Sequence, residues 1–199
     1  MNQKTGVPVQ VHVDPAIEGR NRLTVAFRLI LAIPHLLIVG GPAAGALSWS
    51  WSDGGQNFGW GAGGVVLGAV AGLVAAIAWF AILFTGRFPD GLWNLVAFYM
   101  RWRVRAVAYM ALLRDEYPPF GDGLYPAGVE LQAPQGPRDR VSVAFRLILA
   151  IPHLIADSAL GIAWALTSLI AWFAILLTGR YPRDLYDFGV GVLRWSTRV

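Results

Sequence analysis

Four ionisable side chains lie inside apolar segments of the sequence, and their spacing is repeated. Arg28 and His35 are seven residues apart, and the same pair recurs as Arg146 and His153. Seven residues make about two turns of an α-helix, so the Arg and the His of each pair share one helix face. Ionisable residues in membrane segments generally face a protein interior or a wet cavity. These four residues are therefore the first candidate for a functional site, an intramembrane polar site.

A structural role for the same residues stays open. Arg28 could instead extend towards cytoplasmic headgroups, because it lies only about 9 Å along the helix from Arg22. His35 would then bond a backbone carbonyl left free by Pro34, which has no amide donor. We expect no metal at this site, since two His without Cys or carboxylate partners nearby are a weak ligand set.

The elements that carry these residues occur twice. Residues 22–37 read RLTVAFRLILAIPHLL and residues 140–155 read RVSVAFRLILAIPHLI, which are identical at thirteen of sixteen positions with an offset of 118. Residues 77–87 and 170–180 match as IAWFAIL-x-TGR at an offset of 93. The difference of 25 residues equals the length of a Gly-rich insertion in the first copy, residues 40–64. The chain therefore consists of two tandem repeats.

The composition places these repeats in a membrane. Apolar residues make up 56% of the chain and charged residues only 14%, whereas about a quarter of a soluble domain is charged. Intrinsic disorder is excluded by the apolar content, and the absence of cysteine excludes disulfides and thiolate metal sites. The basic residues, which outnumber the acidic ones by 16 to 12, gather beside the apolar runs. This distribution is typical of cytoplasmic flanks of membrane spans rather than of nucleic-acid binding.

Each repeat is predicted to contain the same four parts: a short alternating β-strand, two apolar spans, and an interfacial helix rich in Arg and aromatic residues. We expect an N-terminal cytoplasmic segment with its strand at residues 1–21, a first repeat at residues 22–120 and a second at residues 121–199. The predicted spans and interfacial helix of the first repeat are about 23–39, 65–85 and 90–113, and those of the second are about 141–156, 158–178 and 183–199.

The predicted fold is an all-α integral membrane protein with four transmembrane helices, formed by two tandem parallel-repeat hairpins. A segment of about 20 apolar residues is long enough to cross a hydrocarbon core about 30 Å thick. Only a few residues around Asp157 separate the spans of the second repeat, which predicts an antiparallel hairpin there. The basic flanks place both termini in the cytoplasm and the 40–64 insertion outside it. The repeats would be related by a pseudo-twofold axis along the membrane normal.

The repeated motifs resemble those of a bacterial membrane family, the domain of unknown function 4389, in two tandem copies. The motifs are R-L-x-x-x-x-R-L-I-L-A-I-P-H, then A-W-F-A-I-L-x-T-G-R-[FY]-P, and then L-R-W. Members of the family look like two-helix cassettes that end in Y-P-P-F, and Tyr117-Pro118-Pro119-Phe120 closes the first copy here. The sequence of the second copy stops before that position. The resemblance implies a multi-pass protein of the bacterial inner membrane and brings no activity with it.

Two further sets of residues are candidates for contacts in the membrane. Several Arg side chains would bind anionic lipid headgroups, although the two T-G-R turns among them also fit helix ends with a Gly cap: Arg87, Arg101, Arg103, Arg105, Arg180 and Arg194. A ridge of small residues would either associate with another helix of an oligomer or pack within one chain: Gly64, Gly68, Gly72 and Ala76.

The sequence holds no nucleophile elbow, phosphate loop or dinucleotide fingerprint, so we expect neither an enzymatic activity nor a cofactor. Acidic residues such as Asp115 and Glu116 would pair with nearby Arg. The preferred hypothesis is a non-enzymatic accessory or scaffold subunit that binds anionic lipid, a larger membrane complex, or both. The alternative is a small oligomeric channel or transporter lined by the duplicated Arg/His face. The expected partners are membrane lipids, further copies of the chain or a larger complex, and not nucleic acid.

Overall fold

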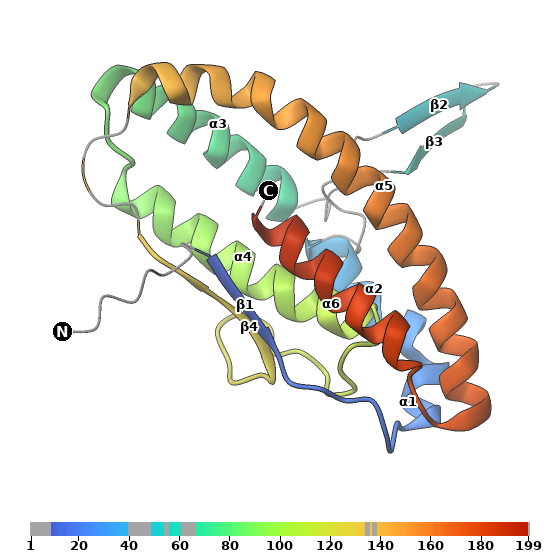
Figure 1. Cartoon of the computed structure of the whole chain (residues 1–199). Coiled ribbons are helices and arrows are strands. Elements are labelled where there is room, and N and C mark those ends of the chain that lie inside the picture. The colour runs from blue at the N-terminus through green and yellow to red at the C-terminus, as the bar shows by residue number, and fades with distance from the viewer. Residues whose placement is uncertain are drawn as a thin grey trace.

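The computed structural model describes residues 9–39, 49–53, 56–60, 67–133, 136 and 139–198. It is mostly helical and contains two antiparallel two-stranded ribbons (Figure 1). The helices are α1 (Arg22–Ala26), α2 (Arg28–Val39), α3 (Leu67–Thr85), α4 (Asp90–Met110), α5 (Arg140–Thr178) and α6 (Arg183–Arg198). The strands are β1 (Val9–Val13), β2 (Trp49–Asp53), β3 (Gln56–Trp60) and β4 (Ala127–Leu131).

The helices are arranged in layers around α4 and α6. In Figure 1, α3 and α5 lie along one side of the molecule, α4 and α6 run inside them, and the β1–β4 ribbon lies on the opposite side. Helix α2 packs against α4, and the ribbon contacts both α4 and α6. The core forms where α4, α5, α6 and the ribbon meet, around Val104, Leu113, Val129, Trp164 and Leu193.

The two predicted β-strands that precede the repeats are present, and they pair with each other. Strand β1 lies antiparallel to β4, with Val11 opposite Val129. These two residues are 118 positions apart, the offset of the repeated sequence. The ribbon therefore joins corresponding positions of the two repeats.

Two tryptophan hydrogen bonds repeat this relation among the helices. The indole Nε1 of Trp79 on α3 donates to the carbonyl oxygen of Val143 on α5 at 3.0 Å. The indole Nε1 of Trp172 on α5 donates to the carbonyl oxygen of Val25 on α1 at 2.9 Å. The two Trp correspond at the offset of 93 and the two Val at the offset of 118. Such reciprocal contacts are produced by a twofold relation between the repeats.

The predicted hairpin of the second repeat is wrong, because α5 is one continuous helix. It runs for 39 residues without a turn at Asp157. Residues 154–160 contain neither Gly nor Pro, so no local signal ends the helix there. Its buried residues are spaced as on one helix face on both sides of the predicted turn, and that face packs against the inner helices: Asp157, Gly161, Trp164, Ala171 and Ile175.

The matching segment of the first repeat, predicted as one span at residues 23–39, is divided into α1 and α2. The division falls at Phe27, where φ is −90° and ψ is 5°. Helix α2 has 12 residues, which span about 18 Å and are too few to cross a core of about 30 Å. The break therefore corrects the first predicted span as well.

Helix α4 lies within the predicted interfacial helix at residues 90–113, but it is a central element of the fold. Its second half and the residues that follow are buried, among them Val104, Val107, Ala108 and Leu113. Helices α3 and α6 lie within the remaining predictions at 65–85 and 183–199. Of the insertion, the paired strands β2 and β3 are described, and residues 40–48, 54–55 and 61–66 lie outside the described residues.

Large apolar side chains are exposed mainly on α2, α3 and α5. Soluble monomers rarely expose many large apolar side chains together, and the exposure of these residues fits contact with lipid. Within the described residues, one helical segment, Ile148–Thr178 of α5, is long and apolar enough to cross a membrane. The exposed side chains include Leu29, Ile30, Leu37, Leu73, Phe80, Phe84, Phe145, Ile148, Leu149, Ile162, Leu166, Phe173 and Leu177.

Two glycines of α6 test the packing of α5 against α6. A Cβ added at Gly189 would lie 2.7 Å from Trp164 Nε1 and 3.2 Å from Leu113 Cδ2. We expect Gly189→Ala to lower the free energy of unfolding by about 1–3 kcal/mol, because the two helices would have to separate. Gly191→Ala should raise it by about 0.5–1 kcal/mol, since nothing lies within 4 Å of that position. Thermal midpoints in detergent measure both, and equal effects of the two substitutions would contradict this packing.

Candidate functional site

The side chain of Arg28 is buried in a network of hydrogen bonds and is 1% exposed. Its Nη1 donates to the carbonyl oxygen of Tyr109 at 2.8 Å and to that of Arg114. Its Nη2 lies 2.5 Å from Asp115 Oδ1, and its guanidinium carbon is 4.3 Å from the centroid of the Tyr109 ring. Arg28 therefore faces the protein interior and does not extend to the surface.

A second guanidinium group, from Arg20, joins the same network. Arg20 Nη2 lies 2.7 Å from Asp115 Oδ1 and donates to the carbonyl oxygen of Leu112, while Nη1 reaches that of Leu113 at 3.4 Å. Burial lowers the pKa of the Arg20 guanidinium, and the attraction of Asp115 opposes that shift. The two Arg thus bind carbonyls at and just beyond the C-terminus of α4, where a helix has unpaired acceptors and a negative partial charge.

His35 lies one layer further along α2 and is fully buried. Its Nδ1 accepts a hydrogen bond from Trp102 Nε1 at 3.3 Å. The Phe120 ring stacks on the imidazole, with centroids 4.7 Å apart and planes at 13°, and the Tyr117 centroid lies 5.0 Å away. The Y-P-P-F motif therefore packs its two rings on His35, while Asp115, just before the motif, binds Arg28.

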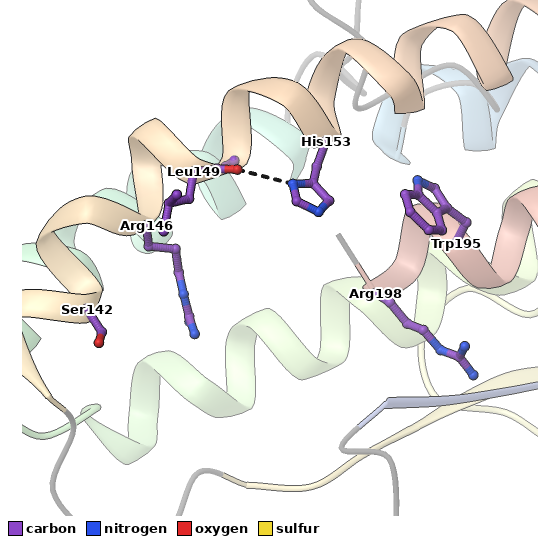
Figure 2. A pocket seen from close by; sticks show the side chains of 7 residues that line it. Ser142, Arg146, Leu149, His153, Trp195 and Arg198 are labelled. Atoms are coloured by element: carbon purple, nitrogen blue, oxygen red, sulfur yellow. Dashed lines mark hydrogen bonds between the residues drawn. The ribbon is translucent and has the colours of Figure 1, made fainter.

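The same two residues of the second repeat have different surroundings. Arg146 and His153 are exposed and line a pocket of about 680 Å³ with Ser142, Leu149, Ala150, Trp195 and Arg198 (Figure 2). His153 Nδ1 lies 3.1 Å from the carbonyl oxygen of Leu149, and its ring stacks on Trp195 with centroids 6.3 Å apart. The four candidate residues therefore form two separate sites, one closed and one open, and do not meet in one shared interior.

The difference follows from the segment after α4. Asp115, Tyr117 and Phe120, which close the first site, lie between α4 and β4. Among the described residues, this segment covers Arg28 and His35.

Three of the Arg residues proposed as lipid contacts have partners within the chain. Arg101 Nε lies 2.9 Å from Asp122 Oδ1, and Arg105 donates to the carbonyl oxygen of Gly121 at 2.6 Å. The hydrogen bond from Arg101 lowers the pKa of the exposed Asp122 carboxyl. Arg103 is buried and interacts electrostatically with Asp157 in the middle of α5.

The other three proposed lipid contacts, Arg87, Arg180 and Arg194, are exposed. The first two belong to T-G-R turns of the same geometry, with Gly86 at φ 72° and Gly179 at φ 75°. In both turns the Thr side chain bonds the backbone on either side of the glycine. The turns are therefore helix ends whose Arg side chains are exposed.

The small-residue ridge lies on α3 and is described in part. Gly72 and Ala76 are exposed, and nothing lies within 4 Å of a Cβ added at Gly72. Gly68 is on the same helix, with its surroundings outside the described residues, and Gly64 lies outside them altogether. At Gly72 and Ala76 the ridge is therefore exposed with respect to the described part of the chain.

The family with the description Domain of unknown function (DUF4389) matches residues 64–121 and 140–199, which together are more than half of the chain. The chain belongs to this family. The first match covers α3, α4 and the Y-P-P-F segment of this DUF4389 protein, and the second covers α5 and α6. The comparisons with curated proteins and with solved structures gave no match.

Some members of the site in this DUF4389 protein were not recognised from sequence. Neither the role of Arg20 nor that of Trp102 was predicted, and Asp115 was expected only to pair with some nearby Arg. One signal was present: Trp102 and Trp195 correspond at the offset of 93, as His35 and His153 do at 118. Because a His and a Trp each occur at corresponding positions of both repeats, the sequence could have indicated a contact between His35 and Trp102.

The duplication supplies a matched test of the closed site. Arg28→Leu should destabilise the DUF4389 protein by about 3 kcal/mol or more, because it leaves two carbonyl groups without their donor and leaves Asp115 with only Arg20 of its two guanidinium partners. Arg146→Leu removes the same side chain from an exposed position and should stay within about 0.5 kcal/mol of the wild type. Thermal unfolding in detergent measures both. Similar midpoints for the two variants would show that the Arg28 network does not stabilise the fold.

Proposed function

We propose that this DUF4389 protein is a non-enzymatic integral protein of the bacterial inner membrane, an accessory or scaffold subunit that binds anionic lipid. One observation carries the proposal. The apolar side chains exposed on α2, α3 and α5 are bounded by exposed Arg residues at both ends of α5. An apolar surface with a basic rim fits a protein that is embedded in lipid and bound to acidic headgroups.

The basic rim consists of residues from both repeats. At the start of α5, Arg140 is exposed, and the hydrogen bond from Trp79 to Val143 brings the end of α3, followed by Arg87, to this place. At the other end Arg180 and Arg183 are exposed. Arg22 joins them, because its guanidinium atoms lie 3.4 Å from where a Cβ of Gly179 would be. Each Arg near an anionic surface contributes about 1 kcal/mol.

The charges at the ends of α5 also bear on topology. Positive flanks favour the cytoplasmic side, and a single crossing by α5 would put one basic end on each side. A helix of 39 residues is about 58 Å long, roughly twice the thickness of the hydrocarbon core. We therefore propose that α5 lies along the cytoplasmic leaflet, with its exposed apolar side chains in the hydrocarbon and both chain termini in the cytoplasm. Four spans, the alternative, would require α5 to bend near Asp157.

The channel alternative has less support from the geometry. Arg28 and His35 are buried against Tyr109, Asp115 and Phe120 of their own chain, so a water path would have to form without them. Among the residues that the structure describes, no group of three or more His, Asp or Glu side chains could hold a metal ion.

Single cysteines test the topology, because the sequence contains none. We expect Arg140→Cys and Arg183→Cys to resist an impermeant maleimide in intact cells and to react after lysis. Reaction of only one of them in intact cells would show that α5 crosses the membrane once. Ser52→Cys, in the insertion, distinguishes the two remaining topologies. A protein with four spans should be labelled at this position in intact cells, whereas a protein embedded only in the cytoplasmic leaflet should not.

Lipid selectivity tests the role of the exposed Arg residues. The thermal midpoint of the wild type should rise when phosphatidylglycerol replaces phosphatidylcholine in mixed micelles. The triple variant Arg87→Gln/Arg180→Gln/Arg194→Gln should lose most of that rise, because three headgroup contacts of about 1 kcal/mol each are removed. The control Arg101→Gln/Arg105→Gln removes charges that already bind the Asp122 carboxylate and the Gly121 carbonyl. The lipid-dependent rise in thermal midpoint should therefore persist in this control. A full rise in the triple variant would refute lipid binding at these residues.

A further inference from the structure

The closed site and the open pocket are built from corresponding residues. At the offset of 118, Arg28 and His35 correspond to Arg146 and His153. At the offset of 93, Trp102 and Arg105 correspond to Trp195 and Arg198. The four second-repeat residues all line the pocket. The second repeat therefore has four of the groups that contact residues 115–122 in the first repeat, and all four are exposed.

The first repeat shows what these groups bind. The Asp115 carboxylate pairs with Arg28, and the Tyr117 and Phe120 rings pack on His35. Arg105 donates to the Gly121 carbonyl, and its Nη2 lies 4.0 Å from Asp122 Oδ1. Residues 115–122 contain no helix or strand. The ligand of the closed site is thus an irregular acidic segment with two aromatic rings between its carboxylates.

The open pocket presents its groups together. Figure 2 shows Arg146 and His153 projecting from the same side of α5, with Trp195 and Arg198 coming from the end of α6. Arg146, His153, Trp195 and Arg198 are all exposed. The volume of about 680 Å³ is within the range of ligand sites. Two exposed guanidinium groups beside an imidazole and an indole can bind carboxylates and aromatic rings at the same time.

We propose that this pocket is a docking site for an extended acidic and aromatic segment of a partner protein. The segment carries a carboxylate at Arg146 and aromatic side chains at His153 and Trp195. At Arg198 it presents a backbone carbonyl followed by a second carboxylate, in the spacing of Asp115, Tyr117, Phe120, Gly121 and Asp122. The inference rests on the proposed scaffold role and names the chemistry of its partner. A lipid phosphate would engage only the two Arg, whereas a peptide of this kind engages all four groups, as in the first repeat.

A labelled synthetic peptide with the sequence of residues 114–123 tests the proposal against the full chain in detergent, with fluorescence anisotropy as the measurement. We expect saturable binding of one peptide per chain. Arg146→Gln and Arg198→Gln should each weaken it at least tenfold, and both should keep the wild-type thermal midpoint because these side chains are exposed. Arg183→Gln is the matched control: it removes an exposed Arg of α6 that does not line the pocket and should leave binding unchanged.

Peptide variants separate a peptide site from a general anion site. Replacing both aspartates of the peptide by asparagine, or both aromatic residues by alanine, should each weaken binding at least tenfold. Equal binding without the rings, or full displacement by millimolar inorganic phosphate or phosphatidylglycerol micelles, would overturn the proposal in favour of an anion or headgroup site. Absence of binding, or equal binding to Arg146→Gln, would overturn it as well. Loss of the lipid-dependent rise in thermal midpoint would count against the proposed function, not against this site.

Discussion

The fold depends on how two buried guanidinium groups are satisfied. Arg20 and Arg28 bind carbonyl groups at the end of α4 and share the carboxylate of Asp115. A buried charge without partners costs several kcal/mol, so these bonds must form together. They join the start of the first repeat to the end of α4 and hold the following segment over α2. The position of Tyr117 and Phe120 on His35 is a consequence of that constraint.

The twofold relation between the repeats explains the rest of the architecture. Val11 faces Val129 in the ribbon, and Trp79 and Trp172 each bond a carbonyl of the opposite repeat. Neither repeat therefore completes its packing alone. The symmetry does not extend to α5, which is one continuous helix where the first repeat has α1, α2 and α3. In the second repeat, a basic and aromatic pocket is lined by residues of α5 and α6, and large apolar side chains are exposed on α5.

Much of the fold could be predicted because its signals are local. The alternation at Val9–Val13, the apolar run of α3 and the T-G-R turns gave strands, a helix and helix ends at about the right residues. The candidate site was predicted in part, since Arg28 and His35 do share one face of α2 and are buried. Their partners Arg20, Trp102 and Asp115 were not predicted, because each is brought there from a distant part of the chain.

The segment that occurs twice in the chain has a different conformation in each repeat. The sequence determined two repeats, their apolar faces and the residues VAFRLILAIPH in each. Only the tertiary structure decided that this segment breaks at Phe27 in the first repeat and continues through α5 in the second. Local helix propensity is the same in both copies, so it cannot produce the difference. What differs is the surroundings: Arg28 is bound to Tyr109, Arg114 and Asp115, whereas Arg146 faces an open pocket. Contacts with a segment more than 80 residues away therefore distinguish two copies whose local sequences are nearly the same.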